Sequence, residues 1–273
     1  IHLFALYIGI DNATFDQIEN YAQSDTAHVM NFFGVYSVAV SSITISNSNC
    51  EGNSVIFVFS SVSILIDGMI LRNSHGFTVQ TVVSTGIATL TNLNFYDNTA
   101  STFFHVIDAP QVIITNSKFT NNSAALIGTT VIMNSAAATV FNCAWTSNTF
   151  HFGGGLLVYE GNAIIDECYF TNNEALMSAA GFWTKSSTVT MSNCLFSGNT
   201  AKYSAAGLYI ASKTNFTLSD SEFSANYADG SGSSIFVQHN QVTISFRNVM
   251  FRYLQAEVTS FVMDSIQSII EAS

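Results

Sequence analysis

The clearest group of side chains with chemical potential in this sequence is a set of evenly spaced cysteines. Cys143, Cys168 and Cys194 are 25 and 26 residues apart. One cysteine per structural repeat would stack the three side by side. Two outcomes stay open: a buried ladder of thiols packed as small apolar groups, or one disulfide between neighbours, which parallel side-chain directions make awkward to close. The spacing is unlike a CxxC zinc site, so we expect neither a metal nor a cofactor.

Carboxylates and histidines give no pattern for acid–base catalysis. A site that cleaves polysaccharides needs clustered carboxylates, but the acidic residues are scattered and do not recur at equivalent positions of neighbouring repeats. Ser74-His75-Gly76 weakly resembles a histidine motif of pectin hydrolases, yet no pair of aspartates accompanies it. His105 and His151 are isolated. The sequence therefore predicts no catalytic residues and no enzyme activity.

Three sequons are candidates for N-glycosylation if the protein is secreted by a eukaryote. Their asparagines are Asn12, Asn121 and Asn215. Asn121 is the strongest candidate because it falls at a position that we expect to be a solvent-facing corner.

The cysteines and sequons lie within a repeat of about 25 residues. Each repeat has an aromatic or aliphatic anchor, usually followed three positions later by asparagine. The anchors are Ile45, Ile70, Phe95, Phe119, Trp145, Phe170, Phe196, Phe223 and Phe251. The asparagines are Asn73, Asn98, Asn122, Asn148, Asn173, Asn199 and Asn226. We interpret them as a structural ladder that hydrogen-bonds along the molecule and satisfies the backbone at a corner, rather than as a binding stripe.

The pattern around each anchor is typical of short strands. Positions −7 and −5 are apolar or small, position −3 is polar, and a cluster of small residues such as Gly153-Gly154-Gly155 follows about eleven positions later. Alternation with a period of two indicates strands, and no helical period is sustained. Helical repeats do not fit this pattern, and propeller blades are longer. The sequence therefore predicts an all-β, right-handed parallel β-helix of about nine or ten coils.

Composition agrees with this fold and restricts the partners. Hydrophobic residues make up 48% of the 273 residues and charged residues 9%, so Ser, Thr and Asn must supply the polar surface. Seven basic against eighteen acidic residues give a net charge of −11. Nucleic acid is excluded as an expected partner because phosphate binding needs a basic surface.

Phe95-x-x-Asn98, Phe119-x-x-Asn122 and Phe170-x-x-Asn173 resemble the FxxN motif of chlamydial polymorphic outer membrane proteins. Gly154-Gly155-Leu156 is similar to the GGA[ILV] motif of that family. Related repeats occur in large pectin-lyase-like surface proteins, and the resemblance covers roughly residues 38–255. It implies a cell-surface adhesive protein. Most of the later glycine pairs depart from the motif and read Ala-Ala-Gly or Gly-Ser-Ser.

Together these features predict one β-helix domain over residues 1–273, forming a section of a longer protein. Residues 1–37 form a less regular first coil, residues 38–255 the regular repeats, and residues 256–273 part of a further coil. We expect an extracellular or cell-surface structural or adhesive protein, for example a repeating segment of a filament or surface coat. The expected partners are other copies of the chain through self-assembly, neighbouring copies of a longer β-helix, glycans, and host or cell surfaces. The alternative is a carbohydrate-active β-helix enzyme or a carbohydrate-binding module. The latter would need aromatic side chains in an exposed row, whereas the repeat places its anchors inside.

Overall fold

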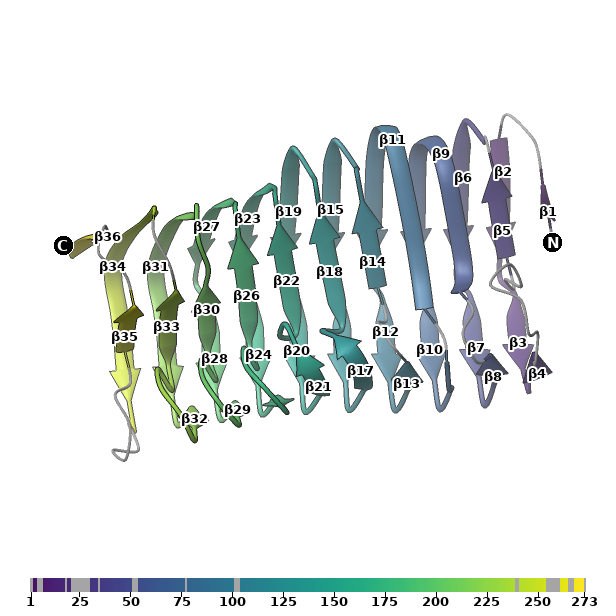
Figure 1. Cartoon of the computed structure of the whole chain (residues 1–273). Helices are drawn as coiled ribbons and strands as arrows, with labels where there is room; N and C mark the ends of the chain where they lie inside the picture. Colours follow the sequence, from purple (N-terminus) through teal and green to yellow (C-terminus); the bar gives the residue numbers. More distant parts are fainter. Residues whose placement is uncertain are drawn as a thin grey trace.

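The structure is a computed structural model of the chain, and it describes residues 2–3, 7–17, 19–20, 30–33, 35–50, 54–76, 78–100, 104–238, 241–253, 261–264 and 268–272. The described chain winds as a right-handed parallel β-helix with about 26 residues per turn (Figure 1). Every strand pairing is parallel, and the described residues contain no helix. The predicted fold class is confirmed.

Each regular coil contributes strands to three ladders that run the length of the molecule. Ladder 1 contains β2 (Tyr7–Asp11), β6 (Ser37–Ser41), β9 (Ser54–Asp67), β11 (Thr78–Thr91), β15 (Gln111–Thr115), β19 (Ala137–Phe141), β23 (Asn162–Asp166), β27 (Thr188–Ser192), β31 (Asn215–Ser224), β34 (Val242–Arg252) and β36 (Ser268–Ala272). Ladder 2 contains β3 (Thr14–Asp16), β7 (Thr44–Ser46), β10 (Ile70–Arg72), β12 (Asn94–Tyr96), β16 (Lys118–Thr120), β20 (Ala144–Thr146), β24 (Tyr169–Thr171), β28 (Leu195–Ser197) and the later halves of β31 and β34.

Ladder 3 closes each coil before the chain returns to ladder 1. It contains β1 (His2–Leu3), β5 (Met30–Phe33), the first parts of β9 and β11, β14 (Phe104–Ile107), β18 (Thr130–Met133), β22 (Leu156–Tyr159), β26 (Phe182–Lys185), β30 (Leu208–Ile210), β33 (Ile235–Gln238) and β35 (Phe261–Asp264). A minor sheet lies between ladders 2 and 3. It contains β13 (Thr99–Ala100), β17 (Ser123–Ile127), β21 (Thr149–Phe152), β25 (Glu174–Ala175), β29 (Thr200–Ala201) and β32 (Tyr227–Ala228), and the pair β4 (Glu19–Asn20) and β8 (Asn49–Cys50) forms a separate small sheet.

The polar residues predicted to turn the chain adopt the left-handed backbone conformation. The corner between ladders 1 and 2 has a φ between +50° and +67° at Asn12, Ser42, Gly68, Asn92, Asn116, Asn142, Glu167, Asn193, Asp220 and Asn248. The corner after ladder 2 and the corner after ladder 3 use the same conformation, for example at Asn121 and Asn134. Asn and Gly tolerate this region better than other residues, so their recurrence follows from the backbone geometry.

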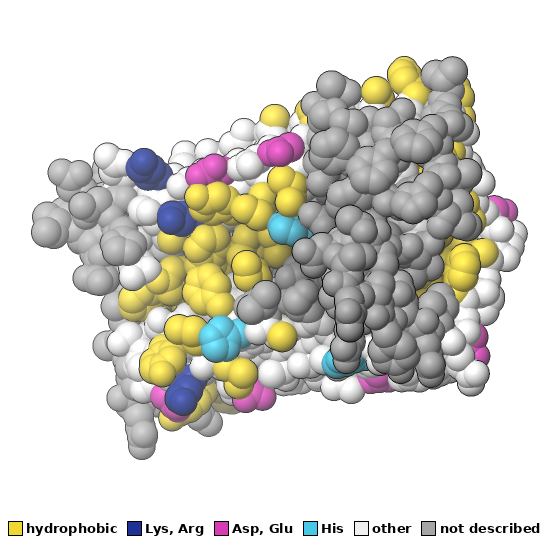
Figure 2. Space-filling view, turned by 45° about the vertical axis from the view of Figure 1, so that its right-hand side comes forward, with side chains coloured by type: hydrophobic (Ala, Val, Ile, Leu, Met, Phe, Trp, Pro, Cys, Tyr) yellow, Lys and Arg dark blue, Asp and Glu magenta, His cyan; other side chains and the backbone are white. Residues whose placement is uncertain are grey.

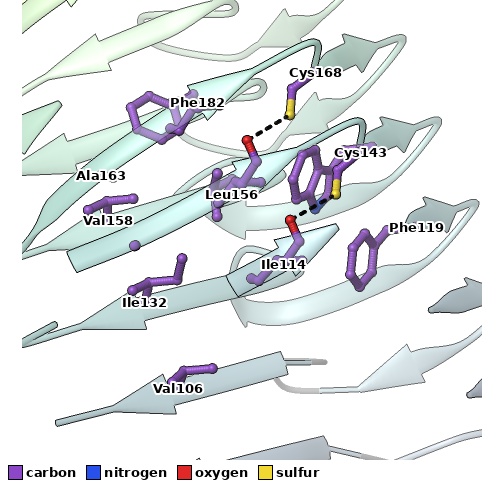
Figure 3. Packing of buried hydrophobic residues seen from close by; sticks show 14 of the residues in the cluster. Val106, Ile114, Phe119, Ile132, Cys143, Leu156, Val158, Ala163, Cys168 and Phe182 are labelled. Atoms are coloured by element: carbon purple, nitrogen blue, oxygen red, sulfur yellow. Dashed lines mark hydrogen bonds between the residues drawn. The ribbon is translucent and has the colours of Figure 1, made fainter. Parts of the chain in front are cut away.

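The interior of the β-helix is a continuous column of apolar side chains. From Phe119 onward the anchors in ladder 2 stack ring on ring: the centroids of Trp145 and Phe170 are 4.9 Å apart, and those of Phe170 and Phe196 are 4.8 Å apart. Inward residues of ladders 1 and 3 complete the core (Figure 3). The indole Nε1 of Trp145 donates to Oγ1 of Thr130 at 3.1 Å, so the buried indole has its hydrogen bond.

One coil has its anchor one residue later than the sequence pattern suggested. Leu71, and not Ile70, pairs with Ile45 and Phe95 in ladder 2 and is fully buried. Successive side chains of a strand point to opposite faces, so a shift of one residue moves Ile70 to the other face. The error arose because Ile70 and Leu71 are both apolar and neither is aromatic.

Small residues at the start of ladder 3 allow close approach of the backbone. A Cβ atom on Gly181 would lie 2.4 Å from the carbonyl oxygen of Gly207 and 2.8 Å from Cδ1 of Phe196. A Cβ atom on Gly155 would lie 2.8 Å from the Trp145 side chain. The small-residue cluster therefore makes room for the anchors of ladder 2.

Candidate functional site

Six of the seven predicted ladder asparagines form one buried chain of hydrogen bonds. Nδ2 of Asn148 donates to the carbonyl of Phe119 in the preceding coil at 2.8 Å and to Oδ1 of Asn173 in the next coil at 3.0 Å. Its Oδ1 accepts from the backbone N–H and the Nδ2 of Asn122 at 3.0 and 3.1 Å. The side chain thus uses both donors and both acceptor positions. Asn98, Asn122, Asn173, Asn199 and Asn226 are buried in the same chain of contacts.

Asn73 does not belong to this ladder. Ser74 takes the position, because its backbone N–H donates to Oδ1 of Asn98 at 3.0 Å. Asn73 is exposed at the preceding corner with a φ of +48°, and its Nδ2 lies 3.4 Å from Oδ1 of Asn47. The assignment of Asn73 was wrong for the same reason as that of Ile70, the shift of one residue in this coil.

The three regularly spaced cysteines are free, buried thiols in successive coils, and Figure 3 shows the first two of them, Cys143 and Cys168. Sγ of Cys143 lies 3.7 Å from the carbonyl oxygen of Ile114, and Sγ of Cys168 lies 3.8 Å from that of Val140. The neighbouring thiol of Cys168 and burial together raise the pKa of Cys143. Contact with Cys143 lowers the pKa of Cys168, whereas contact with Cys194 and burial raise it. The raising effects are larger, so the pKa of Cys168 is above its ordinary value. Of the two outcomes left open, the structure contains the thiol ladder.

All three sequon asparagines are exposed. Asn12 and Asn121 lie at left-handed corners, where Nδ2 of Asn12 donates to Asp11 at 2.9 Å and Nδ2 of Asn121 donates to Asp97 at 2.6 Å. Asn215 begins β31 and lies beside the corner that follows ladder 3. Each side chain can be reached from solvent, which is the structural requirement for a glycan acceptor.

The scattered carboxylates have a shared structural role. Several lie at corners and accept hydrogen bonds from the next coil, as when Asp67 accepts from Asn92 at 2.7 Å and Asp166 accepts from Asn193 at 2.8 Å. The Asn248 amide and the nearby Arg247 guanidinium lower the pKa of Asp220. Among the described residues, no three His, Cys, Asp or Glu side chains are placed to hold a metal ion.

The histidines remain apart from these groups. His75 and His151 are exposed, whereas His105 in β14 is partly buried, and its Nε2 lies 3.2 Å from Sδ of Met133. Burial lowers the pKa of His105.

A second set of aromatic side chains lies on the outer face of the β-helix. The sequence pattern did not predict this set. The outward positions of β22, β26, β30 and β33 form a row in register: Leu157, Trp183, Tyr209 and Phe236. Tyr159 lies two residues after Leu157 in β22, and its ring centroid lies 6.3 Å from that of Trp183. Phe152, from the end of β21, meets Trp183 edge to face at 5.6 Å. Figure 2 shows apolar side chains gathered on this face, with both basic and acidic side chains at the edge of the patch.

We call the hollow on this face the lateral groove. It encloses about 630 Å³, and its lining residues are Phe152, Trp183, Lys185, Tyr209, Ala211, Ser212, Lys213, Gln238 and Gln241. The size is that of a small-molecule site, and the lining combines aromatic side chains with lysine, serine and glutamine side chains. The hydroxyl of Tyr209 hydrogen-bonds Oε1 of Gln238. The Nζ of Lys185 lies 5.7 Å from the ring centroid of Tyr159, a cation–π contact.

Residues 128–252 match the family model described as a right handed beta helix region. The chain is a β-helix repeat protein. The match covers a little under half of the chain and includes the whole lateral groove. No curated protein and no solved structure matches the β-helix significantly. The match and the fold agree with pectin-lyase-like proteins in general, and the finer resemblance to chlamydial repeats remains a prediction.

Among the described residues, no helix is long and apolar enough to cross a membrane.

Proposed function

We propose that this β-helix is an extracellular or cell-surface protein with a structural or adhesive role. The observation that carries the proposal is the repetition of the outer surface. Successive coils place equivalent side chains in register, as in the outward column of Thr89, Ile113, Thr139, Ile164 and Thr190 in ladder 1. A periodic surface offers the same weak contact many times, and linked weak contacts give strong attachment.

The polar chemistry of the described coils also supports a structural role. Amide, hydroxyl and carboxylate groups hydrogen-bond between coils: the asparagine ladder does so inside, and corner aspartates such as Asp67 do so outside. Exposed sequons at Asn12, Asn121 and Asn215 fit a secreted protein. The proposed partners are neighbouring copies or further coils of a longer β-helix, glycans, or host or cell surfaces.

Localisation of the natural protein tests this proposal. Antibodies against the purified chain should label intact, unpermeabilised cells, and brief protease treatment of those cells should remove the signal. Labelling that appears only after permeabilisation would contradict a surface location. The filament form of the proposal predicts intact masses larger than this chain in native material, and an isolated monomer of about 30 kDa with natural ends would contradict that form.

The alternative is a carbohydrate-active enzyme, which the general likeness to the pectin-lyase-like fold favours. A screen of acidic polysaccharides for newly released reducing or unsaturated ends distinguishes the two functions. Turnover that increases with protein concentration would support the enzyme and contradict the non-catalytic role proposed here.

A further inference from the structure

The two tryptophans of the chain differ in one respect that points to a ligand. Trp145 is inside the β-helix, and its indole N–H donates to Thr130. Trp183 is on the outer face, is only 8% exposed, and its Nε1 is buried with no hydrogen-bond partner among the described residues. A buried donor without an acceptor is costly, and such groups in native structures call for an explanation. Trp183 lines the lateral groove, so a ligand there would contact the indole that carries this donor.

The charged groups of the lateral groove are all cationic. Lys185 and Lys213 line it, and neither lies within ion-pair distance of a carboxylate among the described residues. Glu160, the residue after Tyr159, accepts a hydrogen bond from the Tyr159 hydroxyl and so raises the pKa of that hydroxyl, and Glu160 does not line the groove. The lining of the groove therefore carries two positive charges and no negative charge, on a chain of net charge −11. Complementary charge favours an anion here.

Aromatic side chains form part of the remaining wall. Trp183 and Tyr209 have ring centroids 6.4 Å apart with planes 27° from parallel, and Phe152 closes one side. Trp183 and Tyr209 are each only 8% exposed, so a sugar ring would find little free aromatic face on which to lie. A planar ligand ring that lies between Phe152 and the two lysines can contact the edges of the Trp183 and Tyr209 rings and exclude water from them.

From these observations we propose that the lateral groove binds a small aromatic carboxylate. The aromatic ring lies against Phe152, Trp183 and Tyr209, and the carboxylate accepts hydrogen bonds from Lys185 or Lys213, with the Trp183 N–H as a further donor. This site adds a soluble ligand to the structural or adhesive role proposed above and does not depend on it.

Isothermal titration calorimetry of the full chain with 2-naphthoate tests the proposal, with 2-naphthamide as the uncharged probe of the same shape. We expect saturable binding of one naphthoate per chain, at least tenfold tighter than binding of the amide. The affinity should weaken as ionic strength rises, because the charges of the groove are screened. Equal binding of the two probes, or no saturable binding of naphthoate at millimolar concentration, would overturn the proposal.

Matched variants locate the site. Lys185→Met and Lys213→Met remove the charges and keep the aliphatic chains, so each should weaken naphthoate binding several-fold and the double variant more. Lys118→Met changes an exposed lysine on ladder 2, away from the groove, and should bind like the wild type. Wild-type affinity in the double variant, with the fold intact by circular dichroism, would place any binding elsewhere and refute the site.

The two tryptophans provide a control that separates binding from folding. Trp183→Phe removes the unpartnered donor, so it should weaken naphthoate binding several-fold with little change in melting temperature. Trp145→Phe removes a satisfied donor from the core, so it should lower the melting temperature and leave the affinity of the folded protein unchanged. The opposite pattern would show that Trp183 has only a packing role.

Discussion

At the scale of single residues, the buried asparagines show how one side chain can join three coils. Asn148 contacts Phe119 and Asn122 on one side and Asn173 on the other. We expect Asn148→Ala to leave these backbone and amide groups without partners, and to lower the free energy of unfolding by roughly 3 kcal/mol, given about 1–3 kcal/mol for each buried unsatisfied group. Urea denaturation followed by circular dichroism measures this loss.

Asn121→Gly is the matched control for that variant. Asn121 is exposed and has a φ of +52°, a conformation that glycine adopts without strain. Its stability should therefore stay within about 0.5 kcal/mol of the wild type, as for most surface substitutions. Equal losses in the two variants would mean that the buried ladder is no more important than the exposed corner.

The stacked cysteines predict a loss of stability at alkaline pH. Contact between the thiols and burial raise the pKa of Cys143 and Cys168 in the folded protein. The unfolded chain releases these protons near pH 8.5, the ordinary value for cysteine, while the folded protein keeps them. Their contribution to stability is therefore complete below about pH 8.5 and decreases as the pH rises above it. Urea midpoints at pH 7 and pH 10 in the presence of reductant should show this decrease.

The double variant Cys143→Ala, Cys168→Ala separates the loss of stability caused by the thiols from that caused by other groups. Tyrosines titrate at alkaline pH in both proteins, so their effect is present in both and the difference reports the two thiols. We expect the variant to lose less stability than the wild type between the two pH values. An identical pH dependence would show that these thiols have the same pKa in the folded and unfolded chains.

At the scale of strands and corners, glycine has a packing role in one place and a conformational role in another. A Cβ atom on Gly181 would overlap Gly207 and Phe196, so Gly181→Ala should destabilise the protein by about 1–3 kcal/mol, the usual cost of overpacking a well-packed interior. Gly9→Ala is the control, because nothing lies within 4 Å of its added Cβ. Thermal unfolding of both variants tests the difference, and a loss at Gly9 as large as that at Gly181 would contradict it.

The left-handed corners predict the opposite effect of adding a glycine. Ala225 is exposed with a φ of +52°, whereas the corresponding corner of the preceding coil has Gly198. The left-handed conformation costs a residue with a Cβ about 1–2 kcal/mol, and glycine loses about 0.5–1 kcal/mol of that gain through chain entropy. Ala225→Gly should thus raise stability by about 0.5–1 kcal/mol. Ala144→Gly, in the extended strand β20, should lower it by a similar amount, and the same sign in both would refute the argument.

Strand order, corners and the inner ladder could be predicted from sequence because one residue type recurs at each position. The shift at Ile70 arose where the aromatic anchor was missing, so two apolar neighbours fitted equally well.

The lateral groove was missed for a different reason: Leu157, Trp183 and Tyr209 lie next to inward residues in apolar runs. Alternation cannot assign a face when both neighbours are buried. The useful signal was the run itself, because a half-exposed strand should alternate and β22, β26 and β30 do not.

At the scale of the whole molecule, each coil contacts chiefly the coils before and after it. The free energy of such a solenoid is close to a sum of coil and interface contributions, so damage to one coil should have its largest effect nearby. Phe170 is fully buried and stacks on Trp145 and Phe196, one coil away on each side. Its loss removes contacts from two interfaces at once.

We therefore expect Phe170→Ala to lower stability by about 3–5 kcal/mol, as for large buried aromatics, with an effect that depends on position. In hydrogen exchange followed by mass spectrometry, amides of β20, β24 and β28 should lose the most protection, and those of β6 and β7 the least. Tyr169→Ala is the matched control, because Tyr169 is the preceding residue on the opposite face of β24 and is 45% exposed. Its exchange pattern should resemble that of the wild type. A uniform loss of protection along every coil of Phe170→Ala would show that the β-helix unfolds as one cooperative unit, because local damage would then be shared by all interfaces.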